Sequence, residues 1–198
     1  MVIMPSPSPS PAPSPSLSDD VKQVIEVFQR LFFAPYDTEL IAGADEPIYL
    51  PATNHGDQIN RLYFREDFLS SALHETAHWC IAGVDRRRLE DFGYWYNPDG
   101  RTPDQQQIFE VAEIKPQALE WMFSVACRQP FRLSVDNLSA GQARASEGFA
   151  QAVSRQAVQW CVPGALPDRA ELFIRGLMDA FDNNGVIDPQ HYQLYRLI

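Results

Sequence analysis

The sequence predicts a single α+β domain: a small mixed sheet packed with helices, with a central helix that carries the segment HETAH at 74–78. Two observations predict this class. Helical and strand-like stretches neither alternate strictly nor separate into blocks along the chain, so neither a regular parallel α/β sheet nor a two-block arrangement is expected. About 180 residues remain once the N-terminal tail is set aside, and 45% of the chain is hydrophobic, which fits one domain with one core.

Residues 1–18 are predicted to be a disordered tail, and residues 19–198 to form the domain. The tail, MVIMPSPSPSPAPSPSLS, alternates proline with serine or alanine. Proline lacks the backbone donor that helices and sheets need, and serine adds no apolar area, so an extended, polyproline-like chain is expected. A docking peptide for a proline-recognition module is the alternative interpretation of the same composition.

The domain is expected to begin with an amphipathic helix followed by two short strands. Asp19 and Asp20 suit a helix N-terminus, apolar residues follow them at helical spacing, and Pro35 is expected to end the helix. The strands are predicted at Ile48–Leu50 and Arg61–Phe64, on either side of a turn-rich stretch.

The next predicted helix runs from Phe68 to Ile81 and contains HETAH. Asp67 is expected to cap its N-terminus, and Gly83 is its stop signal. Residues 85–103 are rich in Arg, Gly, Pro and Asp, and they are expected to form a strand and loops.

Helices are expected to dominate the second half of the chain. One is predicted from Asp104 to Ala126, where Pro116 either kinks it or opens its second half. The apolar run FRLSV at Phe131–Val135 is interpreted as a strand. Two further helices are predicted near 143–162 and 168–181, followed by a polar turn and a short final segment.

Net charge, hydropathy and cysteine content limit the functions and compartments that the sequence suits. The formal net charge is −10, which disfavours direct binding to nucleic acid phosphates. No apolar run approaches the roughly 18 residues of a membrane span, and no secretory signal begins the chain, so a cytoplasmic protein is expected. The three widely spaced cysteines argue for a reducing compartment and against a cysteine-bound zinc.

The segment HETAH is the strongest chemical signal. His74 and His78 are four residues apart, so on a helix they project from one face and can converge on one metal ion. The alternative is two half-buried histidines with backbone or carboxylate partners. In peptidases with this motif, the residue at the position of Glu75 is the general base, and a zinc hydrolase is therefore one interpretation of the sequence.

A catalytic metal site needs a third protein ligand. Glu110, Glu113 and Gln117 share one face of the helix predicted at 104–126. Glu113 is favoured because it lies in the more apolar run EVAEIKPQ, where a solvated carboxylate is harder to explain. On spacing alone Glu113 is only modestly preferred to Glu110, Asp91 or Asp136.

Several strings in order resemble one known family. They are DEPIYLPA (45–52), SALHETAHWCIAG (71–83), DFGYWYNPDGR (91–101), EIKPQALEW (113–121) and SVDNL (134–138). Together they resemble the elongation factor P hydroxylases over most of residues 20–140. The resemblance fades in the C-terminal third, and the Pro/Ser tail looks like an addition to the family pattern.

The resemblance implies a non-haem iron monooxygenase that hydroxylates a β-lysylated lysine of translation elongation factor P and so completes its modification. It implies Fe(II) as the cofactor and His74, His78 and Glu113 as its ligands, with open positions for dioxygen. It also implies a fold like that of a bacterial endoribonuclease family with a histidine-rich metal site. No anchor for 2-oxoglutarate is found in the sequence.

The substrate arm implied by this family is long and polycationic. Aromatic faces such as Tyr94, Trp95 and Tyr96 could hold an ammonium group by cation–π attraction, although ordinary packing explains them equally well. Carboxylates could pair with the same cation; the candidates are Asp91, Asp99 and Asp136.

The role of Glu75 stays open in a hydroxylase, which does not need the peptidase base. It is interpreted as a partner of a metal ligand, a substrate contact or a surface charge. A zinc hydrolase and a non-catalytic metal-binding protein remain the alternatives to the hydroxylase.

Overall fold

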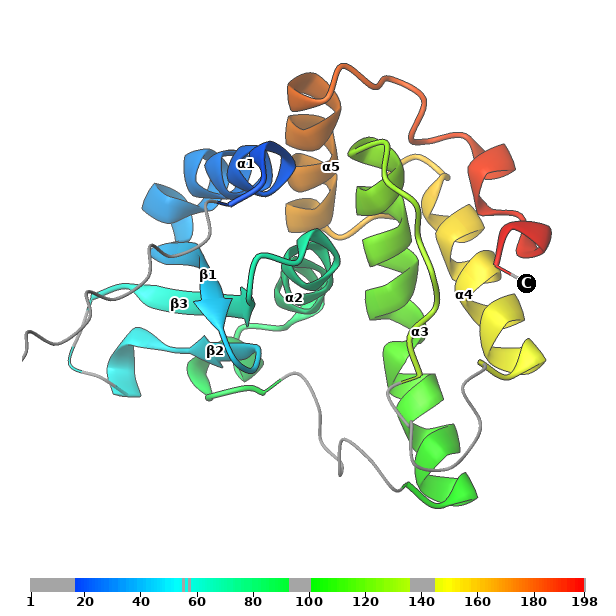
Figure 1. Cartoon of the computed structure of the whole chain (residues 1–198), viewed down its shortest axis with the longest axis horizontal. Helices are drawn as coiled ribbons and strands as arrows, with labels where there is room; N and C mark the ends of the chain where they lie inside the picture. Colours follow the sequence, from blue (N-terminus) through cyan, green and yellow to red (C-terminus); the bar gives the residue numbers. More distant parts are fainter. Residues whose placement is uncertain (1–16, 55, 57, 93–100, 136–144, 198) are drawn as a thin grey trace, which may run out of the picture.

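The computed structural model describes residues 17–54, 56, 58–92, 101–135 and 145–197. Its sheet has three strands in the order β1-β3-β2. β1 (Thr38–Ala44) pairs with β3 (Asn60–Arg65) in parallel, and β2 (Ile48–Leu50) pairs with β3 antiparallel. The small mixed sheet expected from the sequence is therefore present, with helices packed against it (Figure 1).

β1 was not predicted from the sequence. Its segment TELIAGA ends in small residues that carry little strand signal. The pairing with β3 is also irregular between Ile41 and Ala44, where Gly43 adopts a φ of 94°. Glycine tolerates this backbone conformation and commonly marks such irregularities within strands.

α1 (Asp19–Tyr36) begins where it was expected, with Ser18 as its N-cap. It runs through Pro35 and ends one residue later, at Tyr36, and Asp37 follows in the left-handed region with a φ of 46°. Pro35 falls in the last turn, so it does not stop the helix at the residue before it as the sequence predicted.

α2 (Leu69–Ile81) carries His74 and His78 and lies between the sheet and the C-terminal helices (Figure 1). It packs against α1, α3, α5 and β3. The prediction that Asp67 caps it was wrong: Phe68 occupies the N-cap position, and no side chain makes a capping hydrogen bond there. The helix stops just before Gly83, with Ala82 at the C-cap.

α3 (Pro103–Ala126) is one helix of 24 residues that passes through Pro116. Thr102 and Gln105 form a capping box at its N-terminus, with the Thr102 hydroxyl accepting from the Gln105 N–H and the Gln105 side chain accepting from the Thr102 N–H. This reciprocal cap explains why the helix begins at Pro103.

Residues 131–135 do not form a strand, contrary to the sequence prediction. The segment runs beside α3, where the Gln117 side chain donates to the Ser134 carbonyl at 2.8 Å and accepts from the Ser134 N–H at 3.1 Å. An amide side chain thus takes the place of a partner strand. The Phe131 ring stacks on Trp121 at 5.5 Å between ring centroids.

The remaining helices are α4 (Glu147–Trp160) and α5 (Asp168–Ala180), somewhat shorter than the predicted 143–162 and 168–181. Short 3-10 turns complete the described chain: η1 (Ala52–Asn54), η2 (Arg86–Arg88), η4 (Pro189–Tyr192) and η5 (Leu194–Arg196). Over residues 85–92 an isolated bridge between Tyr49 and Asp91 replaces the expected strand.

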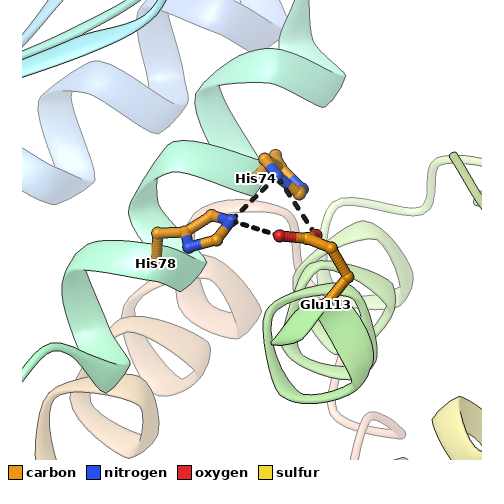
Figure 2. Close-up of side chains that lie close together, drawn as sticks. All are labelled: His74, His78 and Glu113. Atoms are coloured by element: carbon orange, nitrogen blue, oxygen red, sulfur yellow. Dashed lines mark hydrogen bonds and ion pairs between the residues drawn. The ribbon is translucent and has the colours of Figure 1, made fainter. Parts of the chain in front are cut away.

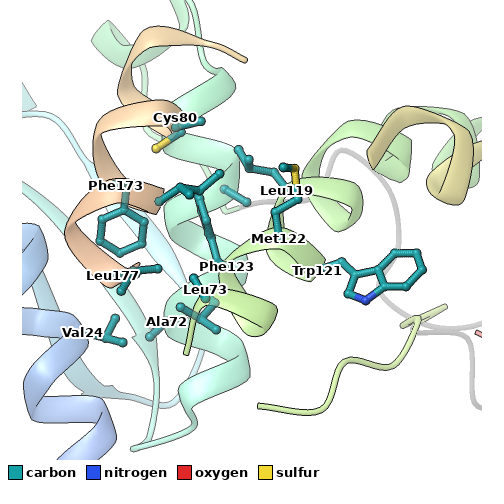
Figure 3. Close-up of a cluster of buried hydrophobic side chains, with 14 of the residues drawn as sticks. Val24, Ala72, Leu73, Cys80, Leu119, Trp121, Met122, Phe123, Phe173 and Leu177 are labelled. Carbon is teal, nitrogen blue, oxygen red and sulfur yellow. The ribbon is translucent and has the colours of Figure 1, made fainter. Parts of the chain in front are cut away.

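One core joins the helices and the sheet. Figure 3 shows α1, α2, α3 and α5 meeting through buried side chains, among them Val24, Leu73, Phe123 and Phe173. The three cysteines are free thiols. Among the described residues, no helix combines the length and the apolar character that crossing a membrane requires.

Arg169 of α5 hydrogen-bonds to the carbonyl groups at the C-terminal end of α2, the helix that carries His74 and His78. Its guanidinium donates to the carbonyl oxygens of Trp79 and Cys80 at 3.0 Å and of Ala82 at 2.6 Å. It also lies 4.8 Å from the centre of the Trp79 ring. A cation at a helix C-terminus satisfies the last carbonyls and opposes the negative end of the helix dipole.

We therefore expect Arg169→Met to lower the free energy of unfolding by about 2–3 kcal/mol, because charged hydrogen bonds to the end of α2 are lost. Urea unfolding followed by circular dichroism measures this change. Arg175→Met is the control, because Arg175 lies on the same helix in an exposed ion pair with Glu171 and should cost at most about 1 kcal/mol. Equal effects of the two substitutions would contradict the role of Arg169.

Candidate metal centre

Two histidines of α2 and one glutamate of α3 converge on one point (Figure 2). The Nε2 atoms of His74 and His78 lie 3.1 Å apart. Oε1 of Glu113 lies 3.1 Å from Nε2 of His78, and Oε2 lies 3.6 Å from Nε2 of His74. Neither histidine is fully buried, whereas Glu113 is only 4% exposed.

The separations of these atoms fit a single metal ion. Histidine nitrogens bind such ions at about 2.1 Å, so two ligands at right angles lie about 3.0 Å apart. The three separations between these atoms, from 3.1 to 3.6 Å, are close to this value. Two imidazoles and one carboxylate from two packed helices form the kind of donor set that holds a divalent metal and leaves further positions open.

A hydrogen-bonded chain holds the Glu113 carboxylate in place. Gln117, one turn later on α3, donates to Oε2 of Glu113 at 3.3 Å and to the Ser134 carbonyl at 2.8 Å. Gln117 is fully buried. Gln117 and Glu113 share one helix face, as the sequence predicts, and Ser134 in the following segment anchors Gln117.

Glu120 belongs to the site although it was not predicted from the sequence. Its Oε2 lies 2.8 Å from Nδ1 of His74, and the side chain is buried. A carboxylate on the second ring nitrogen fixes the orientation and tautomer of a metal-binding histidine. The spacing of Glu113, Gln117 and Glu120 by four and then three residues is the signal that could have identified it.

The carboxylates around His74 change its affinity for protons. Burial alone would lower the pKa of His74, but its hydrogen bond to the Glu120 carboxylate and the charges of Glu113, Glu120 and Glu75 raise it to about 10. Burial would raise the pKa of Glu113, but the charges of His78 and His74 and the hydrogen bonds from His78 and Gln117 together hold that pKa at about 2. A metal ion must displace the proton from His74, so we expect its binding to release protons and to strengthen with pH.

Glu110, the alternative third ligand, lies apart from this cluster. Its carboxylate accepts from the Ser146 hydroxyl at 2.6 Å and from the Ser146 N–H at 3.3 Å. Ser146 is the N-cap of α4, so Glu110 joins α3 to the start of that helix. It is not in the group formed by His74, His78 and Glu113.

Glu75 is buried beside the histidines, with 6% of its surface exposed. This excludes the surface-charge interpretation. Burial raises the pKa of Glu75 even though His74 and His78 oppose the shift. Asp91 lies nearby and pairs with Arg86 at 2.7 Å. The other residues named as substrate contacts lie outside the described residues: Tyr94, Trp95, Tyr96, Asp99 and Asp136.

Known proteins with similar sequences indicate the family of this chain. The profile of the family described as Elongation factor P hydroxylase matches residues 27–192. The chain belongs to this family. It is also 47% identical, over 158 residues, to the elongation factor P lysine hydroxylase of Haemophilus influenzae, a match that covers 80% of this chain and 87% of the relative.

The family match confirms the resemblance seen in the sequence and extends it. It runs from within α1 to η4, so the expectation that the likeness fades in the C-terminal third was wrong. The helices α4 and α5 contain none of the family-like sequence strings quoted above, yet both lie inside the match. The Pro/Ser tail lies outside it.

Proposed function

We propose that the protein is an Fe(II)-dependent monooxygenase that hydroxylates a β-lysylated lysine of translation elongation factor P. The observation that carries this proposal is the convergence of His74, His78 and Glu113 in a chain of the elongation factor P hydroxylase family. Two histidines and one carboxylate are the ligand set of many non-haem iron oxygenases. The reaction is proposed to take place in the cytoplasm, without direct contact with nucleic acid or membrane.

In this proposal the metal is held by Nε2 of His74, Nε2 of His78 and the Glu113 carboxylate. Iron(II), when bound, supplies the activation of dioxygen that insertion of oxygen into a C–H bond requires. Glu120 accepts the Nδ1–H of His74 and keeps Nε2 of that ring free to bind. Gln117 orients Glu113. The co-substrate 2-oxoglutarate is not part of the proposal.

The substrate arm carries positive charge, which the acidic character of the chain favours. The net charge of −10 would attract a basic face of elongation factor P, and added salt should weaken this attraction. Tyr94, Trp95, Tyr96, Asp91 and Asp136 stay proposed contacts of the substrate. Asp91 would share its carboxylate with Arg86.

The proposal is tested by supplying the metal and the substrate separately. The full chain is purified without oxygen, loaded with Fe(II) or Zn(II), and mixed with β-lysylated elongation factor P and a reductant. With Fe(II) and ¹⁸O-labelled dioxygen, we expect the substrate to gain the mass of one labelled oxygen atom. With Zn(II), we expect no gain. Peptide cleavage by the zinc form, with no oxygen gained by the iron form, would instead identify a zinc hydrolase.

A further inference from the structure

Glu75 is a buried carboxylate without a hydrogen-bonding partner among the described residues. Only 6% of its surface is exposed, and no hydrogen bond or ion pair joins it to the part of the chain that the structure describes. Burying an unpaired carboxylate is costly, whereas a cation held against it offsets much of that cost. The environment of Glu75 therefore suits a ligand that brings a positive charge.

A small cavity lies beside this carboxylate. It measures about 20 Å³ and is lined by Glu75, His78, Tyr49, Leu62, Trp79 and Asp91, among others. A cavity of this size holds one group as large as a water molecule. A primary ammonium has that size, whereas a trimethylated ammonium is much larger.

Two arginines also line the cavity, but both have other partners. Arg86 binds Asp91 through Nε at 2.8 Å and through a terminal nitrogen at 2.7 Å. Arg87 donates to the Ala82 carbonyl at the end of α2. Within the part of the chain that the structure describes, neither arginine forms an ion pair with Glu75, and the nearest charges of opposite sign are those of His74 and His78.

The cavity adjoins the metal centre through His78, which belongs to both. A group held against Glu75 in the cavity would therefore lie beside the ring of one of the three converging ligands. Tyr49 adds an acceptor: its hydroxyl donates to the Arg87 carbonyl at 3.0 Å, which leaves the lone pairs of its oxygen for a donor.

We propose that Glu75 and this cavity bind the primary ammonium group of the lysine-derived substrate and so set its position along the metal centre. The identity of the amine rests on the proposed function, but the binding of a primary ammonium does not. Glu75 thereby acts as a substrate-binding residue that selects a small, charged amine.

Direct binding of a model amine tests the proposal. The full chain, with and without Zn(II), is titrated with butylammonium, butyltrimethylammonium and butanol while the Trp79 indole signal is followed by NMR. We expect saturable shifts with butylammonium alone. Glu75→Gln should weaken butylammonium binding at least about tenfold, whereas the exposed Glu26→Gln, which makes the same charge change on α1, should not alter it. Equal binding by the wild type and Glu75→Gln would overturn the proposal.

Steady-state kinetics distinguish a role of Glu75 in binding the ammonium group from a role as a general base. With elongation factor P as substrate, we expect Glu75→Gln to raise KM at least about tenfold and to change kcat much less. Glu75→Asp, which retains the charge, should recover part of the lost affinity and serves if the glutamine variant does not fold. An unchanged KM with a lost kcat would overturn the proposal. Because the butylammonium titration needs no elongation factor P, its result stands apart from a failure of the proposed function.

Discussion

Replacement of Glu113 by alanine is expected to abolish hydroxylation of elongation factor P, whereas Glu110→Ala is expected to preserve it. Glu113 lies 3.1 Å from Nε2 of His78, and its removal leaves two neutral imidazoles to hold the metal. Loss of a residue that only hydrogen-bonds a metal ligand lowers activity by at most about 100-fold. Loss of a ligand itself should cost more, so we expect kcat/KM to fall by more than about 100-fold. Glu110 instead binds Ser146 at the start of α4.

Turnover of β-lysylated elongation factor P, followed by mass spectrometry under saturating Fe(II), measures this difference. Glu113→Asp is a useful companion, because it keeps the carboxylate but withdraws it from the histidines, and intermediate activity is expected. Activity that survives Glu113→Ala and is lost in Glu110→Ala would move the third ligand to Glu110. Circular dichroism of each variant verifies that its helices are intact.

Replacement of Glu120 by alanine is expected to weaken metal binding by about 10–100-fold, the range seen when the partner of a ligating histidine is lost. Without Glu120, the His74 ring loses the acceptor 2.8 Å from its Nδ1 and can turn or adopt the other tautomer. Glu120→Gln keeps an acceptor oxygen at that place, so its affinity should lie between those of the wild type and Glu120→Ala.

Titration with Co(II), whose absorption bands report both affinity and coordination, measures this effect without requiring turnover. Glu26→Ala, which removes an exposed carboxylate on α1, is the matched control and should bind Co(II) like the wild type. A wild-type affinity and spectrum in Glu120→Ala would show that Glu120 does not position His74.

The local parts of the candidate metal centre could be predicted from the sequence. His74 and His78 are four residues apart on a helix whose apolar pattern is clear, so their convergence needs no knowledge of the tertiary fold. Glu113 was favoured over Glu110 because its surroundings are apolar, and it is indeed the more buried of the two. Both are local properties that the sequence carries.

The parts that depend on packing could not be predicted in this way. Glu120 shares the helix of Glu113, but its role becomes visible only once α3 is known to face α2. FRLSV resembles a strand, yet the Gln117 side chain satisfies the backbone of Ser134 in place of a partner strand. β1 pairs with β3 from Thr38 to Ile41 and again at Ala44, despite a weak local pattern. In each case tertiary contacts outweigh local preference.

A crystal structure of the full chain loaded anaerobically with Fe(II), with the metal located by its anomalous scattering, would reveal which side chains bind iron. We expect one iron ion bound by Nε2 of His74, Nε2 of His78 and the carboxylate of Glu113, with Glu120 still hydrogen-bonded to Nδ1 of His74. Iron bound without Glu113, or bound at another place in the chain, would contradict this expectation.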